Sequence, residues 1–240
     1  MSTQHKFTGT GVAIITPFKA DLSIDYTGLE KQIERLISNG VNYLIVLGTT
    51  GESVTQSEQE KEELVQFIIQ KVNKRIPIVL GVGSNNTQAV LNIIRKTDFS
   101  RIDAILSVAP YYNKPTQEGL FQHFKAIAEV CPVDVILYNV PDRTGSNIEA
   151  ETILRLAHEF KNIVAVKEAS GDFSQAMHII KEKPEHFAVI SGDDALTLPL
   201  ISVGMSGVIS VAANAFPKDF STMVQLALNN DFKEAEKIHY

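Results

Sequence analysis

Lys167 has the surroundings in this sequence that most strongly suggest chemistry. It ends the apolar run 163–167 and is followed by Glu168, Ala169 and a Ser170-Gly171 turn. An amine at the end of a buried strand lies close to low dielectric, which disfavours the ammonium form and leaves more neutral amine. Lysines of this kind form imines with carbonyl substrates. On this segment alone, however, a lysine that simply extends its ammonium group into water is the favoured interpretation.

Other groups capable of chemistry also follow apolar runs. The loop 48–53 carries two glycines with Thr49 and Thr50, and its backbone N–H groups and hydroxyls could hold a carboxylate. Tyr112 and Tyr138 could pass protons, and Arg143 could receive a second carboxylate. Each feature has an ordinary alternative: a plain turn, a tyrosine at the protein surface, a solvated arginine. Together with Lys167 they predict an enzyme that activates a 2-keto acid and joins it to an acidic partner.

Metal chemistry is not predicted. Asp193 and Asp194 are adjacent, but no spaced set of ligands accompanies them, and the six histidines are dispersed without a metal-binding motif. A role for this pair in a turn or a helix cap is favoured. We therefore expect neither a metal nor a cofactor.

The elements that must position these groups are eight apolar runs separated by amphipathic stretches. The runs are apolar on both faces, which suits a parallel sheet covered by helices. We expect the strands at 12–15, 43–47, 78–82, 104–108, 135–138, 163–167, 188–190 and 207–210.

The helical stretches between them have recognisable ends. Asn39-Gly40 is expected to stop one helix, and Ser57 begins a capping box with Glu60. Thr87, Thr116 and Asn147 are expected to cap later helices. The alternation predicts the α/β class and a (β/α)8 TIM barrel forming a single domain over 1–240, with an open doubly wound sheet as the rival. In a barrel the candidate groups would gather at the carboxyl ends of the strands.

Composition bounds the remaining possibilities. With 22 basic and 28 acidic residues the net charge is -6, which gives no sign of a nucleic-acid surface. No apolar run is long enough to cross a bilayer, and the polar start lacks a signal-peptide core. Cys131 is the only cysteine, so no intrachain disulfide can form. These features predict a soluble cytoplasmic protein.

Six ordered motifs give the chain a family resemblance from about residue 7 to its end. It resembles the dihydrodipicolinate synthase family within the pyruvate-dependent class I aldolases and lyases. The motifs are GTTGES at 48–53, PYYNKP at 110–115, YNVPDRTG at 138–145, KEASG at 167–171, SGDDA at 191–195 and GVISV at 207–211.

The resemblance implies a reaction: pyruvate condenses with L-aspartate-4-semialdehyde to give 4-hydroxy-tetrahydrodipicolinate in lysine (diaminopimelate) biosynthesis. It assigns Lys167 to the Schiff base, and Thr49, Tyr138 and Tyr112 to a proton relay, with Tyr112 supplied by a neighbouring subunit. A homotetramer or homodimer is implied. Substrate binding falls to Thr50, Arg143, Ile209 and Gly192.

Two other activities remain open. Relatives resembling N-acetylneuraminate lyase or keto-deoxy-sugar aldolases keep the lysine and the tyrosine, although they typically lack the run containing Arg143. A barrel fragment that binds without turnover is the second alternative. An unrelated phosphate-binding barrel is remote, because the loop 212–215 has no glycine-rich cradle.

Two departures from the family pattern carry expectations. Ala89, Gln56 and Glu58 stand where lysine-inhibited members have other residues, which argues against feedback inhibition by lysine, although Ser53, Asn85 and Tyr111 are compatible with it. The sequence ends in the helical pattern 231–240 without a stop signal. We therefore expect the chain to end within the first helix after the barrel and to lack the family's further C-terminal helices.

Overall fold

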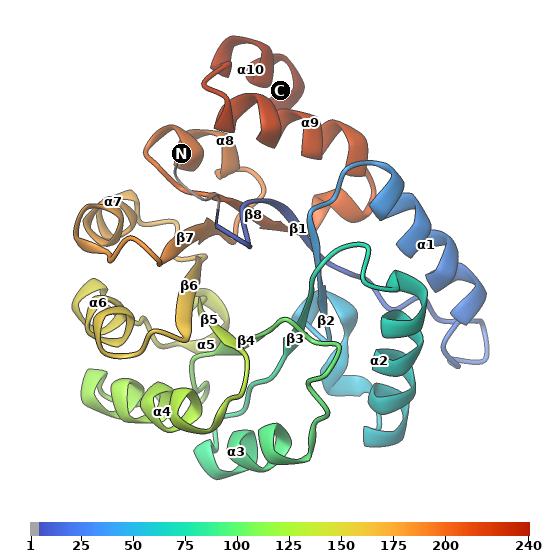
Figure 1. The fold of residues 1–240 in the computed structure, drawn as a ribbon, viewed down its shortest axis with the longest axis horizontal. Helices are drawn as coiled ribbons and strands as arrows, with labels where there is room; N and C mark the ends of the chain where they lie inside the picture. Colours follow the sequence, from blue (N-terminus) through green and yellow to red (C-terminus); the bar gives the residue numbers. More distant parts are fainter. Residues whose placement is uncertain (1–4) are drawn as a thin grey trace.

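Eight parallel strands close into a barrel in the computed structural model, which describes residues 5–240. Each strand pairs with its sequence neighbours, and the last pairs with the first (Figure 1). This confirms the predicted (β/α)8 TIM barrel, and the open sheet was the wrong alternative. The strands are β1 (Gly9–Ala13), β2 (Tyr43–Val46), β3 (Ile78–Gly81), β4 (Ala104–Val108), β5 (Asp134–Asn139), β6 (Ile163–Glu168), β7 (Ala188–Ser191) and β8 (Gly207–Ser210).

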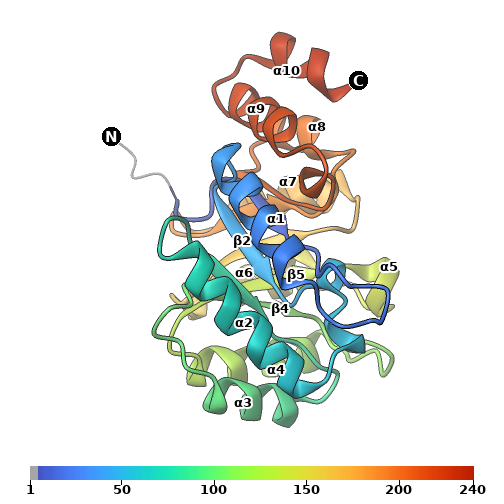
Figure 2. The same cartoon turned by 90° about the vertical axis from the view of Figure 1, so that its right-hand side faces the viewer.

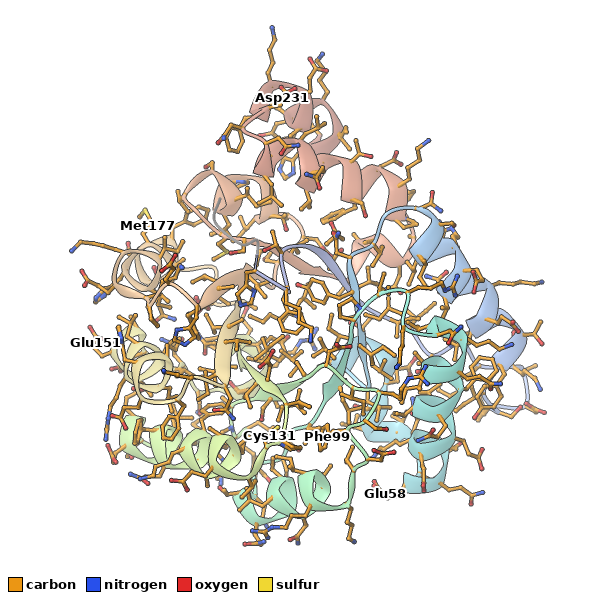
Figure 3. The ribbon with its side chains drawn as sticks, viewed as in Figure 1. Glu58, Phe99, Cys131, Glu151, Met177 and Asp231 are labelled. Atoms are coloured by element: carbon orange, nitrogen blue, oxygen red, sulfur yellow. The ribbon has the colours of Figure 1, made fainter. Side chains whose placement is uncertain are left out.

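Helices form a ring around this barrel. The side chains of Glu151 and Met177 lie on the outer side of that ring (Figure 3). The helices are α1 (Tyr26–Ser38), α2 (Glu58–Val72), α3 (Thr87–Lys96), α4 (Gln117–Val130), α5 (Pro141–Thr144), α6 (Ala150–Glu159), α7 (Phe173–Glu182), α8 (Thr197–Ser202), α9 (Pro217–Leu228) and α10 (Phe232–His239). The last of them, α10, packs on α9 and α8 and lies outside α9 (Figure 2). Within residues 5–240, no helix is both long and apolar enough to cross a membrane.

The core has two layers, because successive residues of a strand face opposite sides of the sheet. On β6, Ala165 belongs to the cluster inside the barrel, whereas Val166 belongs to the cluster between strands and helices. Alternation therefore turns Lys167 inward and Glu168 outward. On β5, Ile136 and Tyr138 face inward in the same way.

The first strand lies earlier than the sequence pattern predicted. It begins at Gly9 rather than at residue 12, and Gly9 pairs with Gly207 of β8. Glycine has low strand propensity, which concealed this segment. It is required here because a Cβ on Gly207 would lie 2.0 Å from the Gly9 carbonyl oxygen, and one on Gly11 would lie 2.2 Å from the Tyr43 ring.

Helix caps were predicted correctly where the local sequence decides them. Ser57 forms the expected capping box, and Thr116 accepts from the backbone N–H of Gly119. Two predicted caps were wrong. Asn86, not Thr87, caps α3, and Glu149 stands at the cap position of α6 in place of Asn147. The side chains of Thr87 and Asn147 bond to residues distant in sequence instead, which a local pattern cannot reveal.

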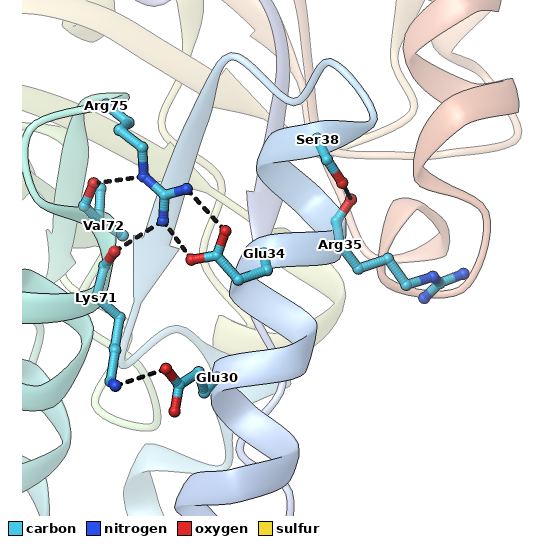
Figure 4. A network of polar contacts seen from close by, with 7 residues as sticks. All are labelled: Glu30, Glu34, Arg35, Ser38, Lys71, Val72 and Arg75. Carbon is cyan, nitrogen blue, oxygen red and sulfur yellow. Dashed lines mark hydrogen bonds and ion pairs between the residues drawn. The ribbon is translucent and has the colours of Figure 1, made fainter.

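Adjacent helices of the ring are joined by ion pairs on their exposed faces. Between α1 and α2, Lys71 contacts Glu30 at 2.6 Å and Arg75 contacts Glu34 at 2.7 Å (Figure 4). Arg75 also donates to the carbonyls of Val72 and Lys71, which fixes its guanidinium at the end of α2. Such solvent-exposed pairs add little stability individually, so the buried layers hold the barrel together.

Candidate active site

Strands β5 and β6 bring Lys167 and Tyr138 together inside the barrel. The two residues are directly paired across the parallel strands. The Lys167 Nζ atom lies 4.4 Å from the centroid of the Tyr138 ring. Both side chains come from the carboxyl ends of their strands, which is where TIM barrels carry their active sites. The candidate site is therefore built on rigid elements.

Lys167 is buried, with only 5% of its surface exposed. The pKa of its ammonium group is lowered from 10.5 to about 8, mainly by desolvation, and the positive charge of Arg143 acts in the same direction. The negative charge of Asp194 opposes both effects. Burial thus prevails over the neighbouring acid. The interpretation of Lys167 as a solvated surface lysine was wrong.

Tyr138 is also largely buried, and desolvation raises the pKa of its phenol, with a smaller opposing effect from Arg143. The hydroxyl is therefore protonated at neutral pH and is able to donate a proton. Thr49 and Tyr112, the other two members of the predicted relay, are both exposed. A proton relay through these three hydroxyls remains a prediction.

Gly192 lies directly against the stem of Lys167. A Cβ at this position would come within 2.9 Å of the lysine Cε and 2.6 Å of the Ala169 Cβ. The backbone N–H of Gly192 also donates to the Glu168 carbonyl at 2.8 Å. Any side chain here would displace the lysine, so glycine is required by packing.

The loop after β2 folds into two short 3₁₀ turns, Thr49–Gly51 and Ser53–Thr55, on either side of Glu52 in a left-handed conformation. Thr49 is exposed and Thr50 is partly buried. Gln56, buried at 7% exposure, donates to the Gly51 carbonyl at 2.7 Å.

The same Gly51 carbonyl accepts a hydrogen bond from the Thr16 hydroxyl at 2.7 Å, which ties the threonine loop to the chain after β1. Gln56 is also 3.2 Å from that hydroxyl. Motif matching had treated Gln56 only as a departure from a lysine-binding cleft, and it missed that this side chain holds the loop. No local pattern indicates these contacts.

Tyr112 and Arg143 occupy exposed positions at the same end of the barrel. Tyr112 is 88% exposed and has a φ of 75°. Its backbone N–H contacts the Thr144 carbonyl at 3.4 Å, so its loop lies against α5, which carries Arg143. Ile209, in contrast, is buried in the inner layer on β8. The structure thus places Tyr112 at the surface and Ile209 inside the barrel.

Asp193 organises a turn, as predicted, whereas Asp194 bridges two loops. Asp193 accepts from the backbone N–H groups of Ala195 and Leu196. Asp194 accepts from those of Val211 and Ala212, which ties the chain after β7 to the chain after β8. Across residues 5–240, no group of three or more His, Cys, Asp or Glu side chains is arranged to hold a metal ion. The charge that Asp194 presents to Lys167 was not anticipated.

A (β/α)8 barrel with a desolvated lysine at the carboxyl ends of its strands is the architecture of a lysine-dependent aldolase or lyase. The comparisons with known proteins are more specific. The model of the Dihydrodipicolinate synthetase family matches residues 6–240. The chain belongs to this family.

Individual relatives agree with that assignment. A curated protein of Flavobacterium psychrophilum named 4-hydroxy-tetrahydrodipicolinate synthase is 55% identical over 234 residues, covering 98% of this chain and 80% of the relative. A crystal structure of a dihydrodipicolinate synthase is 46% identical with a TM-score of 0.93, covering 98% of this chain and 80% of that one. The pyruvate complex of the Acinetobacter baumannii enzyme is 43% identical with a TM-score of 0.93, covering 97% of this chain and 79% of that one.

Proposed function

We propose that this chain condenses pyruvate with L-aspartate-4-semialdehyde to give 4-hydroxy-tetrahydrodipicolinate, a step of lysine (diaminopimelate) biosynthesis. One observation carries the proposal: a buried Lys167 amine with a pKa lowered to about 8, stacked 4.4 Å from the Tyr138 ring. Curated relatives above 50% identity carry the name of this synthase, and one solved relative is described as complexed with pyruvate.

The lowered pKa supplies the nucleophile. At pH 7 about one amine in ten is neutral when the pKa is about 8, against roughly one in three thousand at 10.5. The neutral nitrogen of Lys167 attacks the C2 carbonyl of pyruvate, and loss of water leaves a protonated imine. Burial therefore raises the concentration of reactive amine by more than two orders of magnitude.

The protonated imine then serves as an electron sink. A methyl proton of pyruvate leaves, the C–H electrons form an enamine, and the enamine carbon attacks the aldehyde carbon of the second substrate. The amino group of that substrate next attacks C2 and displaces the Lys167 nitrogen, which closes the ring and frees the lysine. We assign Tyr138 to these proton transfers, because its protonated phenol lies against the reacting amine.

The carboxylates of the two substrates need separate partners. We assign the pyruvate carboxylate to Thr50 and the turn around it, whose position is fixed by the Gly51 contacts. Ile209 and Gly192 shape the space beside the lysine. We assign the carboxylate of the semialdehyde to Arg143, which is exposed and therefore accessible from solvent.

Reductive trapping tests the imine. Borohydride added with pyruvate should convert the imine to a stable secondary amine, and peptide mapping should find the added mass on Lys167. Lys167→Met is the matched control, because it retains a long apolar stem without the nitrogen. Folded protein whose Lys167 stays unmodified would contradict the mechanism.

Substrate choice needs a separate assay. We expect product formation with aspartate semialdehyde and none with a sugar aldehyde, because Arg143 offers a charge for a carboxylate rather than donors and acceptors for several hydroxyls. Condensation with the sugar aldehyde alone would favour the sugar-aldolase alternative. Trapping of pyruvate without any condensation would favour the non-catalytic fragment.

We propose a homo-oligomer, a tetramer or a dimer, in which Tyr112 enters the site of a neighbouring subunit. Its 88% exposure in one chain supports this assignment, because a relay residue must be covered in the working enzyme. Mixing Tyr112→Phe subunits with Lys167→Met subunits tests it. Each variant should be impaired alone, and mixed oligomers should regain activity if Tyr112 acts across the interface. Failure of the exchanged mixture to recover would contradict this role.

A further inference from the structure

We propose that Asn139 and Glu168 are positioning residues for the reaction, although neither faces the barrel interior. The inference rests on the proposed function, since it explains how the Lys167 amine and the Tyr138 ring are kept in contact. The two positioning residues immediately follow the two site residues on β5 and β6. They lie on the opposite face of the sheet, between the strands and the helices.

Glu168 is a buried carboxylate that depends on neutral donors. It is 3% exposed, and it accepts from two side-chain amides and one backbone N–H group. The Asn139 Nδ2 atom lies 3.0 Å from both carboxylate oxygens. The backbone N–H of Ser170 donates at 2.8 Å, and the Gln175 side chain donates at 3.0 Å. A buried carboxylate without these bonds would be strongly unfavourable, so the donors have little freedom to move.

These side chains form a closed amide ring, defined here as Asn139, Asn147, Gln175 and Glu168. Asn139 donates to Asn147 at 2.7 Å, Asn147 donates to Gln175 at 2.8 Å, and Gln175 donates to Glu168. Donation therefore runs from Asn139 to Glu168 along both sides of the ring. The direction is fixed at its end, because the Glu168 carboxylate accepts hydrogen bonds from Asn139, Ser170 and Gln175.

The amide ring joins the parts of the site that must stay aligned. Asn139 pairs with Glu168 one position beyond the Tyr138–Lys167 pair. The Asn139 Oδ1 atom also accepts from the backbone N–H of Ile148 at 2.9 Å, which anchors the segment that follows Arg143. The Asn139 side chain thus contacts both β6, the strand of Lys167, and the segment that follows α5, the helix of Arg143.

The start of the same strand pair shows why such a contact is needed. The register between β5 and β6 shifts by one residue after Val135, which pairs with Ile163 while Ile136 pairs with Ala165. A one-residue slip exchanges the two faces of a strand. After the irregularity the two strands pair regularly from Ile136–Ala165 onward, and the last pair is Asn139 with Glu168. The Asn139–Glu168 contact accepts only the register that sets Tyr138 against Lys167.

Glu168→Gln tests this proposal at almost constant volume. The new amide presents an N–H₂ group to donors from Asn139 or Gln175, and a flip of Asn139 to relieve this would break its bond to Ile148. We expect kcat, counted per pyruvate-trapping site, to fall about tenfold or more, because small displacements of reacting groups have effects of this size. The KM for pyruvate should change less than kcat.

A double variant provides the rescue. In Asn139→Asp/Glu168→Gln the carboxylate moves to the other strand, and every amide in the ring can flip to donate in the reverse direction. The N–H groups of Ser170 and Ile148 still find acceptors, and the flip of Gln175 gives up only its longer, 3.3 Å hydrogen bond to the Ile148 carbonyl. We expect the double variant to recover kcat to within a few-fold of the unmodified chain, whereas Asn139→Asp alone should be impaired.

Phe124→Leu is the control for ordinary destabilisation. Phe124 is fully buried on α4 in the outer layer, so the change should lower the melting temperature without changing kcat per trapped site. A Glu168→Gln variant that melts earlier but keeps its kcat per site would refute the positioning role. A double variant no better than the worse single variant would refute it as well. If the unmodified chain traps no pyruvate, the proposed function fails first and this inference falls with it.

Discussion

Replacing Lys167 by methionine should abolish imine formation and at the same time stabilise the fold. The structure holds this amine in the barrel interior at 5% exposure, where the ammonium form is disfavoured. Methionine has a similar length, no charge and an apolar surface suited to the same space. The change therefore removes the function and the desolvation penalty together.

The size of the effect follows from the pKa of Lys167. The difference between 10.5 and about 8, at about 1.4 kcal/mol for each pKa unit, corresponds to roughly 3 kcal/mol. At pH 7 the folded wild-type chain bears this cost almost entirely, because the lysine is protonated in both the folded and the unfolded states. Lys167→Met should accordingly raise the free energy of unfolding at pH 7 by about 3 kcal/mol.

The pH dependence identifies the cause. Between pH 8 and 10.5 the unfolded chain binds a proton that the folded chain has released, so wild-type stability rises with pH across this window. The Lys167→Met variant lacks this titrating amine, so its stability does not rise over the same pH range. The stability difference should therefore shrink from about 3 kcal/mol at pH 7 to about 1 kcal/mol at pH 10. Urea unfolding of both proteins at several pH values measures it.

Lys31→Met is the matched control, because Lys31 lies on the exposed face of α1 and undergoes the same chemical change in water. Its stability relative to wild type should not vary over this pH range. A Lys167→Met variant that is less stable than wild type at pH 7 would refute the desolvation argument. So would a stability difference that stays constant from pH 7 to 10.

Three further predictions concern other side chains. Desolvation lowers the pKa of buried His123 to about 4, so the unfolded chain takes up a proton before the folded chain does as pH falls. The free energy of unfolding should therefore drop by about 3 kcal/mol between pH 7 and 4. Urea unfolding at several pH values should show that His123→Gln reduces this dependence. Gln56→Leu leaves the Gly51 carbonyl without one of its buried donors, which should lower the stability measured by thermal melting by about 1–3 kcal/mol. The same change should raise the KM for pyruvate. An unchanged KM would remove the role of Gln56 in holding the threonine loop. Arg143→Ala should raise the KM for aspartate semialdehyde at least about tenfold while Lys167 still traps pyruvate, and equal kinetics with both substrates would remove its assigned role.

The strand pattern could be predicted because a closed parallel barrel requires apolar residues on both faces of each strand. Seven of the eight predicted runs matched the observed strands to within one residue at either end, and β1 was displaced because its glycines are selected by close approach to β8 and to Tyr43. Local caps such as Ser57 were also readable, since both partners lie within four residues. Asn147 was misread because its partners come from β5 and α7.

The positions of the site groups along the chain were therefore determined by the sequence itself. Lys167 and Tyr138 stand one residue before the ends of their strands, Thr49 and Thr50 follow theirs, and alternation sets which residues face inward. Only the tertiary structure decided the environment in which these groups lie. The lowered pKa of Lys167 arises from burial that several strands create together, and the register that pairs it with Tyr138 continues into a contact between Asn139 and Glu168. Desolvation and register are properties of packed neighbours, and no single segment of the chain contains them.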